Sequence, residues 1–357
     1  MLDHLSNRFL FFSLLGRPLN TSDNKYDLNF AYANGAPEQC LNFRACNEDF
    51  IVDEVMDIEL CGEGEHLWLK VKKNGENTQW VAEKLAKFFS VNTNDVGYAG
   101  MKDRHAITTQ WFSIYLPGKS HDFIWDDFIA QSELNAQLLE SGTHSQKLRR
   151  GMHTGNHFVI RLSNLEGCVL EQDELSERLL NVQSEGVPNY FGEQRFGREA
   201  NNITMAVEWF TSGRPIRNRH KKALAMSAAR SYLYNMVLSQ RITRENWSTR
   251  LTGDVDGFDS PTGPLWGRGR ALSSENTLLE EEKALEDYTL WCDQLEHCGL
   301  NQERRSLVLI PEKLSWSFEN TDINTSFLTL SFQLSSGEFA TSVLRELVTL
   351  KNARHSS

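Results

Sequence analysis

The sequence predicts an α/β protein in which a mixed-sheet domain is interrupted by a helix-rich insertion. The chain has 357 residues, more than one hydrophobic core usually supports, so two domains or one domain with a large insertion is expected. Apolar and polar residues alternate near both ends of the chain, as in half-buried strands, whereas residues 186–312 carry helix-like spacing. Strands on both sides of a helical middle indicate a sheet that the chain leaves and later rejoins.

Two strands, a helix and a third strand are expected early in the chain. Residues 49–55 and 66–71 are predicted strands, and Asn74-Gly75 turns the chain into a helix from about Thr78 to Phe89. A strand over 110–116 follows, in which alternate residues face opposite sides. One face is Gln110, Phe112, Ile114 and Leu116, and the other is Trp111, Ser113 and Tyr115.

The remaining elements follow from the same periodicities and from turn-forming residues. They are a helix at 132–140, a strand at 158–162, a helix around Leu175, Leu179 and Leu180 that ends near Gly186, helices around 203–210 and over 221–242, a Gly/Pro/Asp-rich loop region at 253–270, a strand over 328–334 and a final helix through 343–347.

The overall charge, taken alone, argues against a nucleic-acid-binding protein. The chain has 48 acidic and 37 basic residues and a formal net charge of −11, whereas such proteins typically carry a basic domain. The charge is uneven, however, because residues 70–73, 147–150 and 214–222 are locally basic. These three segments, with Arg195 and Arg198, are candidates for phosphate contact, and an exposed solvated face is the alternative for each of them.

Cysteine and histidine spacing predicts neither a disulfide scaffold nor a metal site. The six cysteines contain no Cys-x-x-Cys pair, so we expect reduced thiols in a cytoplasmic protein. His153 and His157 are four residues apart, but the Gly and Asn between them argue against a helix that aims both at one metal. The apolar stretch 9–15 is too short to span a bilayer and is expected to pack at the protein edge.

The most informative segment is a glycine-containing loop followed directly by the predicted strand. Asp103 stands between two cations, Lys102 and Arg104, and Gly97 and Gly100 allow close backbone approach. Adjacent positive charges favour the ionised carboxylate, so Asp103 is expected to be a charged nucleophile or base at neutral pH. A bare Lys-Asp-Arg triplet would be read as a solvated loop. Here sixteen consecutive residues carry the pattern, Val96-Gly-Tyr-Ala-Gly-Met-Lys-Asp-Arg-His-Ala-Ile-Thr-Thr-Gln-Trp111.

This segment closely resembles the active-site motif of the TruD family of tRNA pseudouridine synthases, which reads Gly-Tyr-Ala-Gly-x-Lys-Asp-Arg-x-Ala-x-Thr-x-Gln. Every position of that motif is filled, and the resemblance implies that Asp103 is the catalytic residue. Further segments resemble the same family. They are Phe50-Ile-Val-Asp-Glu54, His66-Leu-Trp-Leu-Lys-Val-Lys-Lys-Asn-Gly75, Arg150-Gly-Met-His-Thr-Gly-Asn-His-Phe158, Pro188-Asn-Tyr-Phe-Gly-Glu-Gln-Arg-Phe-Gly197 and Thr262-Gly-Pro-Leu-Trp-Gly267.

The resemblance implies a specific architecture and reaction. It implies a mixed, largely antiparallel pseudouridine-synthase sheet domain from residues 1–183 and 313–357, an inserted TRUD domain over 184–312, and an RNA cleft between them. The reaction would be isomerisation of uridine to pseudouridine at position 13 of tRNA by a cytoplasmic enzyme. Nothing in the sequence suggests a self-complementary apolar face, so we expect a monomer, and the sequence leaves the oligomeric state open. A redox-neutral isomerisation needs no cofactor, and we expect neither a metal nor a membrane partner.

The resemblance also suggests which residues bind the substrate. Phe158 resembles the residue that stacks on the target base, although a core strand phenylalanine is the alternative from periodicity. Phe50 resembles an active-site aromatic, but by itself it reads as a core residue. Asn156 either holds the loop or the base, or simply forms a turn. Lys102 and Arg104 either tune Asp103 and meet phosphates or form a solvated pair.

Two other function classes are weighed against this interpretation. An RNA-binding or RNA-folding protein without essential catalysis would have no need for the Asp103 motif. A nucleoside hydrolase also cleaves a glycosidic bond, but it would need a water-activating metal or a second catalytic carboxylate, and neither is evident in the sequence. The role of Asp103 stays open between attack on the sugar, attack on the base and abstraction of a ribose proton.

Overall fold

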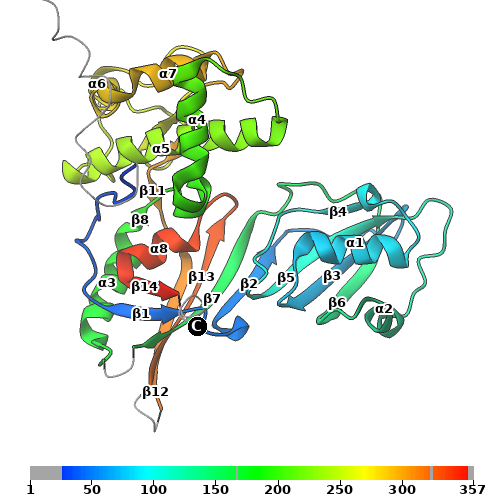
Figure 1. Ribbon diagram of the computed structural model, residues 1–357. Helices are drawn as coiled ribbons and strands as arrows, with labels where there is room; N and C mark the ends of the chain where they lie inside the picture. The colour runs from blue at the N-terminus through cyan, green and yellow to red at the C-terminus, as the bar shows by residue number, and fades with distance from the viewer. Residues whose placement is uncertain (1–25, 166–167, 322–324, 353–357) are drawn as a thin grey trace, which may run out of the picture. The chain divides into compact units, whose positions relative to one another are not determined.

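The computed structural model describes residues 26–165, 168–321 and 325–352, which form two compact units (Figure 1). The sheet unit contains residues 37–184 and the chain from 310 onward. The helical unit contains residues 185–309 together with the N-terminal segment that ends at Ala36. The apolar stretch 9–15 lies outside the described residues.

A ten-stranded sheet dominates the described part of the sheet unit. Its main path runs β12-β13-β7-β2-β5-β3-β6, with β1 and β14 paired beside β7 and with β4 paired to β5. The strands are β1 (Cys40–Phe43), β2 (Phe50–Val55), β3 (His66–Asn74), β4 (Val96–Tyr98), β5 (Ile107–Tyr115), β6 (Ala136–His144), β7 (Gly155–Asn164), β12 (Glu312–Asn320), β13 (Ser326–Ser335) and β14 (Thr349–Asn352).

Alternating side chains explain the centre of this sheet. Buried and half-buried residues alternate in β7 from Phe158 to Asn164 and in β13 from Phe327 to Leu334. The two strands pair antiparallel from Phe327 opposite Ser163 to Ser335 opposite Gly155. Most pairs in the sheet are antiparallel, although β2 pairs with β5, and β1 with β14, in parallel. The predicted mixed sheet is therefore confirmed.

Helix α1 (Thr78–Phe88) covers one face of the sheet, as Figure 1 shows. Its buried stripe packs against Leu69 and Val71 of β3 and against Phe112 and Ile114 of β5. On the opposite face of β5, Trp111 packs with Trp68 and Leu148. Both predicted faces of the 110–116 strand are thus packed: α1 covers the face with Phe112 and Ile114, and the segment around Leu148 covers the face with Trp111.

The remaining helices of the sheet unit are α2 (Trp125–Ser132), α3 (Gln172–Glu185) and α8 (Ala340–Leu347). Helix α3 buries Leu175, Leu179 and Val182. The sequence placed Leu180 on this stripe, but its side chain is 56% exposed. Helix α8 was expected to close the chain, yet β14 follows it and pairs with β1.

The predicted helix over 132–140 is wrong. Helix α2 ends at Ser132, because Glu133 adopts a left-handed backbone conformation with φ of 57°. The chain then becomes β6, whose residues pair with β3 from Ala136 opposite Lys73 to His144 opposite His66. Ala, Leu, Gln and Glu favour a helix in isolation, but pairing with a sheet edge overrides this weak preference.

The helical unit contains four α-helices and two short strand pairs within the described residues. The helices are α4 (Asn201–Ser212), α5 (Arg219–Thr243), α6 (Glu275–Ala284) and α7 (Thr289–Glu296). The pairs are β8 (Val187–Pro188) with β11 (Val308–Leu309), and β9 (Thr262–Leu265) with β10 (Glu303–Ser306). The predicted loop region 253–270 therefore also contains a strand, β9. None of the described helices has the length and apolar character needed to cross a bilayer.

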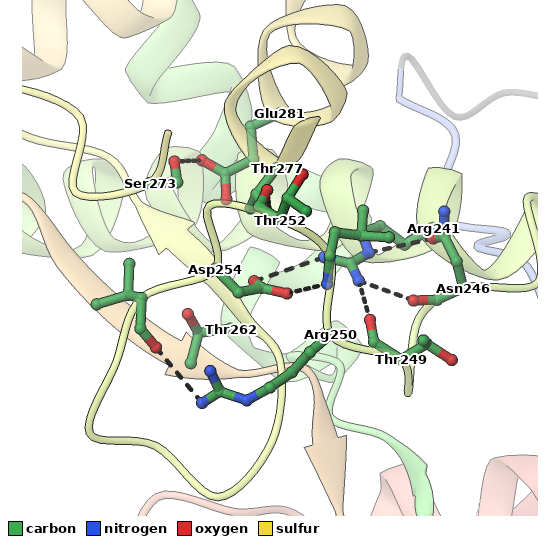
Figure 2. Close-up of polar contacts among 12 residues, drawn as sticks. Arg241, Asn246, Thr249, Arg250, Thr252, Asp254, Thr262, Ser273, Thr277 and Glu281 are labelled. Atoms are coloured by element: carbon green, nitrogen blue, oxygen red, sulfur yellow. Dashed lines mark hydrogen bonds and ion pairs between the residues drawn. The ribbon is translucent and has the colours of Figure 1, made fainter. Parts of the chain in front are cut away.

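A buried arginine fixes the loop that follows α5, as Figure 2 shows. Arg241 is 1% exposed. Its guanidinium donates to Asn246 Oδ1 at 3.1 Å and to the backbone oxygens of Asn246 and Thr249 at 2.8 and 2.6 Å. Asp254 Oδ1 lies 3.8 Å from Arg241 Nη1, and both side chains are almost fully buried. One side chain therefore holds the turn from Asn246 to Asp254 against the end of α5.

Candidate active site

Asp103 lies in the loop between β4 and β5. Strand β2 pairs with β5 at 107–109 and β4 pairs with it at 112–114, so two strands share one edge of β5. The loop of residues 99–106 leaves the sheet at this divided edge. The Asp103 side chain is 42% exposed. Its carboxylate is therefore partly exposed to solvent.

Arg44 forms an ion pair with Asp103. The Arg44 Nη2 atom lies 3.3 Å from Asp103 Oδ2, and the Arg44 side chain is 16% exposed. The guanidinium also lies 4.0 Å from the ring centroid of Phe50 and 4.8 Å from that of Phe43. Arg44 has a φ of 57°, which is uncommon for a residue other than glycine and is often found at constrained functional positions.

Lys102 faces the opposite way from Asp103. It is 8% exposed, so the alternative of a solvated Lys102–Arg104 pair is wrong for this side chain. Its Nζ atom donates to Asn156 Oδ1 at 2.6 Å and lies 3.2 Å from Glu54 Oε1. Asn156 is therefore bonded to the Asp103 loop through the Lys102 side chain. Arg104, on the other side of Asp103 in the sequence, is exposed.

The backbone of the loop is held by α1 and β5. Thr78 Oγ1 accepts from the Lys102 N–H at 3.0 Å and donates to Gln110 Oε1 at 2.8 Å. Gln110 Nε2 in turn donates to the Gly100 carbonyl at 3.2 Å. The cap of α1 is Asn77, which accepts from two N–H groups of the first turn and so orients Thr78. These bonds fix the backbone directly before Asp103.

Gly100 lies where the loop passes close to His153. A Cβ atom built on Gly100 would lie 3.3 Å from the His153 ring. Burial lowers the pKa of His153, and the nearby Lys102 charge lowers it further while Glu54 raises it. The neutral ring can therefore pack against the loop next to the buried charges of Lys102 and Glu54.

Phe50 and Phe158 lie together in an aromatic cluster. Their ring centroids are 6.1 Å apart, and Phe158 stacks on Phe332 at 5.6 Å. Phe50 is 3% exposed and Phe158 is 7% exposed. The Arg44 guanidinium covers the Phe50 ring. The cluster is thus joined to Asp103 through Arg44, and both rings are packed in the sheet unit as described.

The sequence alone did not single out Arg44 or Glu54. It placed Lys73 in the basic segment 70–73 as a candidate for phosphate contact, which is wrong for this residue, because Lys73 is 1% exposed. Arg44 is 59 positions from Asp103, and nothing in the local pattern links them. Glu54 and Lys73 did give a signal, because each falls at an inward position of an alternating strand, where charged residues are rare unless paired. Among the described residues, no cluster of three His, Cys, Asp or Glu side chains could hold a metal ion.

Lys73 is a second buried cation below the loop. It is 1% exposed, and its Nζ atom donates to the Glu76 carbonyl at 2.6 Å. Burial lowers the pKa of Lys73 to about 8, although the negative charges of Asp103 and Glu76 raise it in part. The charged form is therefore costly in the folded state below pH 8.

We expect the stability of the protein to depend on Lys73 ionisation. Between about pH 8 and the ordinary lysine pKa of 10.5, only the unfolded state keeps the proton, so stability rises with pH in this window. Relative to Lys73→Met, the unfolding free energy of the unmodified protein should increase by about 2 kcal/mol between pH 7.5 and 9.5. Urea titrations at the two pH values measure this.

The matched control for this experiment is Lys72→Met, since Lys72 precedes Lys73 on the same strand and is exposed. It should leave the pH dependence of the unfolding free energy unchanged. Parallel pH profiles for Lys73→Met and the unmodified protein would contradict the depressed pKa.

Known proteins resemble this chain over most of its length. The family described as tRNA pseudouridine synthase D (TruD) matches residues 29–210. A tRNA pseudouridine synthase D from Cellvibrio japonicus is 46% identical over 92% of this chain and 95% of the relative. One from Aeromonas hydrophila is 42% identical over 91% of this chain and 95% of the relative.

A solved structure resembles the fold. It is a Methanosarcina mazei protein described as tRNA pseudouridine synthase D (TruD), with a TM-score of 0.68 at 20% identity over 91% of this chain and 97% of that one. At this identity the likeness speaks for the fold alone. The family match covers half of the chain and includes the Asp103 loop, and the relatives share more than 40% of their residues with it. This chain therefore belongs to the TruD family of tRNA pseudouridine synthases.

Proposed function

We propose that the protein isomerises uridine to pseudouridine in tRNA, with Asp103 as the catalytic carboxylate. The reaction breaks the bond between uracil N1 and ribose C1′, turns the base, and joins C5 to C1′. C5 loses its proton and N1 gains one, so the product is an isomer of the substrate. It needs a carboxylate that reaches the ribose or the base. The target uridine is position 13, as the family resemblance implies.

The main support for this proposal is the geometry of the Asp103 loop, together with membership of the TruD family. The carboxylate faces outward, it is paired with Arg44 at 3.3 Å, and the preceding residue is buried. A charged oxygen held in one direction by fixed groups suits attack or proton transfer, because positioning supplies much of the rate enhancement of enzymes. The three routes named for Asp103 share this requirement.

We assign different roles to the other candidate residues. Arg104 is exposed next to Asp103 and suits a phosphate contact. Lys102 and Asn156 act from below the loop, since their polar atoms bond to each other. Phe50 and Phe158 are the aromatic candidates for stacking on the extruded base. Their rings are 3% and 7% exposed, so stacking would require neighbouring side chains to move, including the Arg44 guanidinium over Phe50.

The two units would divide the work on tRNA. In this proposal the sheet unit is the catalytic domain and the helical unit is the inserted TRUD domain, which contributes to RNA binding. Residues 214–222 support that role, because this basic segment is mainly exposed and leads into α5. We further propose that the enzyme works as a monomer in the cytoplasm.

A tRNA transcript labelled with tritium at uracil C5 tests substrate and reaction together. Tritium release is expected, because forming the C5–C1′ bond displaces that hydrogen, and carbodiimide mapping should locate the product at position 13. A transcript with cytidine at position 13 is the control and should yield no product there. Free uracil would instead indicate a hydrolase. Tight binding without tritium release would indicate an RNA-binding protein without essential catalysis.

A further inference from the structure

Glu54 fills a gap along the edge of β5. Strand β2 pairs with β5 only from Ile51 opposite Ile107 to Asp53 opposite Thr109, and β4 pairs with it from 112 to 114. The Trp111 N–H lies between these two pairings and has no strand partner in either of them. It donates to Glu54 Oε2 at 3.1 Å. A side-chain carboxylate thus replaces a missing backbone acceptor.

The charge of Glu54 is balanced by the residue next to Asp103. Glu54 Oε1 lies 3.2 Å from Lys102 Nζ, and the two side chains are 1% and 5% exposed. Lys102 also donates to Asn156 Oδ1 at 2.6 Å. The three side chains come from β2, from the loop and from β7. They therefore connect the loop to both central strands beneath it.

We propose that Glu54 is a positioning residue for Asp103, which rests on the proposed function of the protein. Glu54 holds Lys102 toward the interior, and the next side chain, Asp103, consequently points outward to Arg44. The attachment is strong because a buried ammonium has to remain paired. Glu54 does not approach the substrate in this role, and it acts only through Lys102 and through the Trp111 N–H.

The competing explanation is that Glu54 contributes only to folding stability. Single and double substitutions of Glu54 and Lys102 distinguish this explanation from the positioning role. Glu54→Gln and Lys102→Met each leave one buried charge without its counterpart, so each is expected to lower both stability and activity. The double variant Glu54→Gln/Lys102→Met removes both charges and should recover much of the stability. It does not restore the link between Glu54, Lys102 and Asn156, so activity should stay low.

The experiment measures steady-state kcat and KM on tRNA, together with urea midpoints, for the three variants. We expect kcat to fall about 10- to 100-fold with KM within about threefold, since small misplacement of a reacting group costs up to about 10² in rate. In the double variant the midpoint should return toward that of the unmodified protein while kcat remains low. Glu59→Gln, an exposed glutamate of the same unit, should match the unmodified protein in all measurements.

The other outcomes overturn either the positioning role of Glu54 or the proposed function. A double variant that regains both stability and kcat would make the pair purely structural and would overturn the positioning role. So would a Glu54→Gln variant with unchanged kcat, or failure of all three variants to fold. If the unmodified protein forms no pseudouridine in tRNA, the proposed function itself fails, and the variants are then not needed to decide it.

Discussion

Asp103→Asn is expected to abolish pseudouridine formation in tRNA. Asparagine has nearly the same shape but carries no charge, so it is a poor nucleophile and cannot accept a proton at neutral pH. Proton transfer by a positioned side chain contributes roughly 10²–10⁴-fold, and we expect a loss of at least about 10³-fold in kcat. Tritium release from C5-labelled tRNA measures this rate.

Binding of tRNA should survive this substitution. Removing a negative charge from a surface that faces phosphates does not weaken their attraction, so the Kd should stay within a few-fold of its original value. Asp127→Asn, an exposed aspartate in the first turn of α2, is the matched control and should keep full activity. Product formation by Asp103→Asn within tenfold of the unmodified protein would refute the catalytic role.

The elements that the sequence predicts well are those with strong and regular periodicity. Strands β7 and β13 alternate over most of their lengths, and α1 and α5 bury residues at helical spacing. Strand β6 fails this rule, because it is an edge strand with no buried side chain and has no clear alternation. Its strand conformation comes from pairing with β3, which a local pattern does not contain.

The candidate site, too, was predictable from the sequence only in part. The Asp103 loop is visible in the sequence as one continuous motif, whereas its partners come from distant segments. Arg44 follows β1 and reaches Asp103 only because the chain folds back across the sheet. Lys102 stands beside Asp103 in the sequence and points away from it in space, toward Glu54. The residues next to Asp103 in the sequence are therefore not the ones that contact its side chain. The sequence alone reveals the neighbours but not the contacts.

Arg241→Met is expected to be the most destabilising single change in the helical unit. The substitution removes three hydrogen bonds to the turn after α5 and leaves the buried Asp254 carboxylate without its cation (Figure 2). Breaking one partner of a buried ion pair typically costs about 3–5 kcal/mol. Hydrogen exchange should accelerate at the end of α5 and through residues 246–254, whereas exchange in the sheet unit should be unchanged.

The controls separate burial from charge. Arg219→Met makes the same change in the first turn of the same helix, where the side chain is exposed, and the unfolding free energy should stay within about 0.5 kcal/mol. Adding Asp254→Asn to Arg241→Met removes the unpaired carboxylate and should recover part of the loss. Recovery should be incomplete, because the oxygens of Asn246 and Thr249 still lack the guanidinium that donates to them. Full recovery would mean that the ion pair, and not the anchoring of the turn, makes Arg241 important.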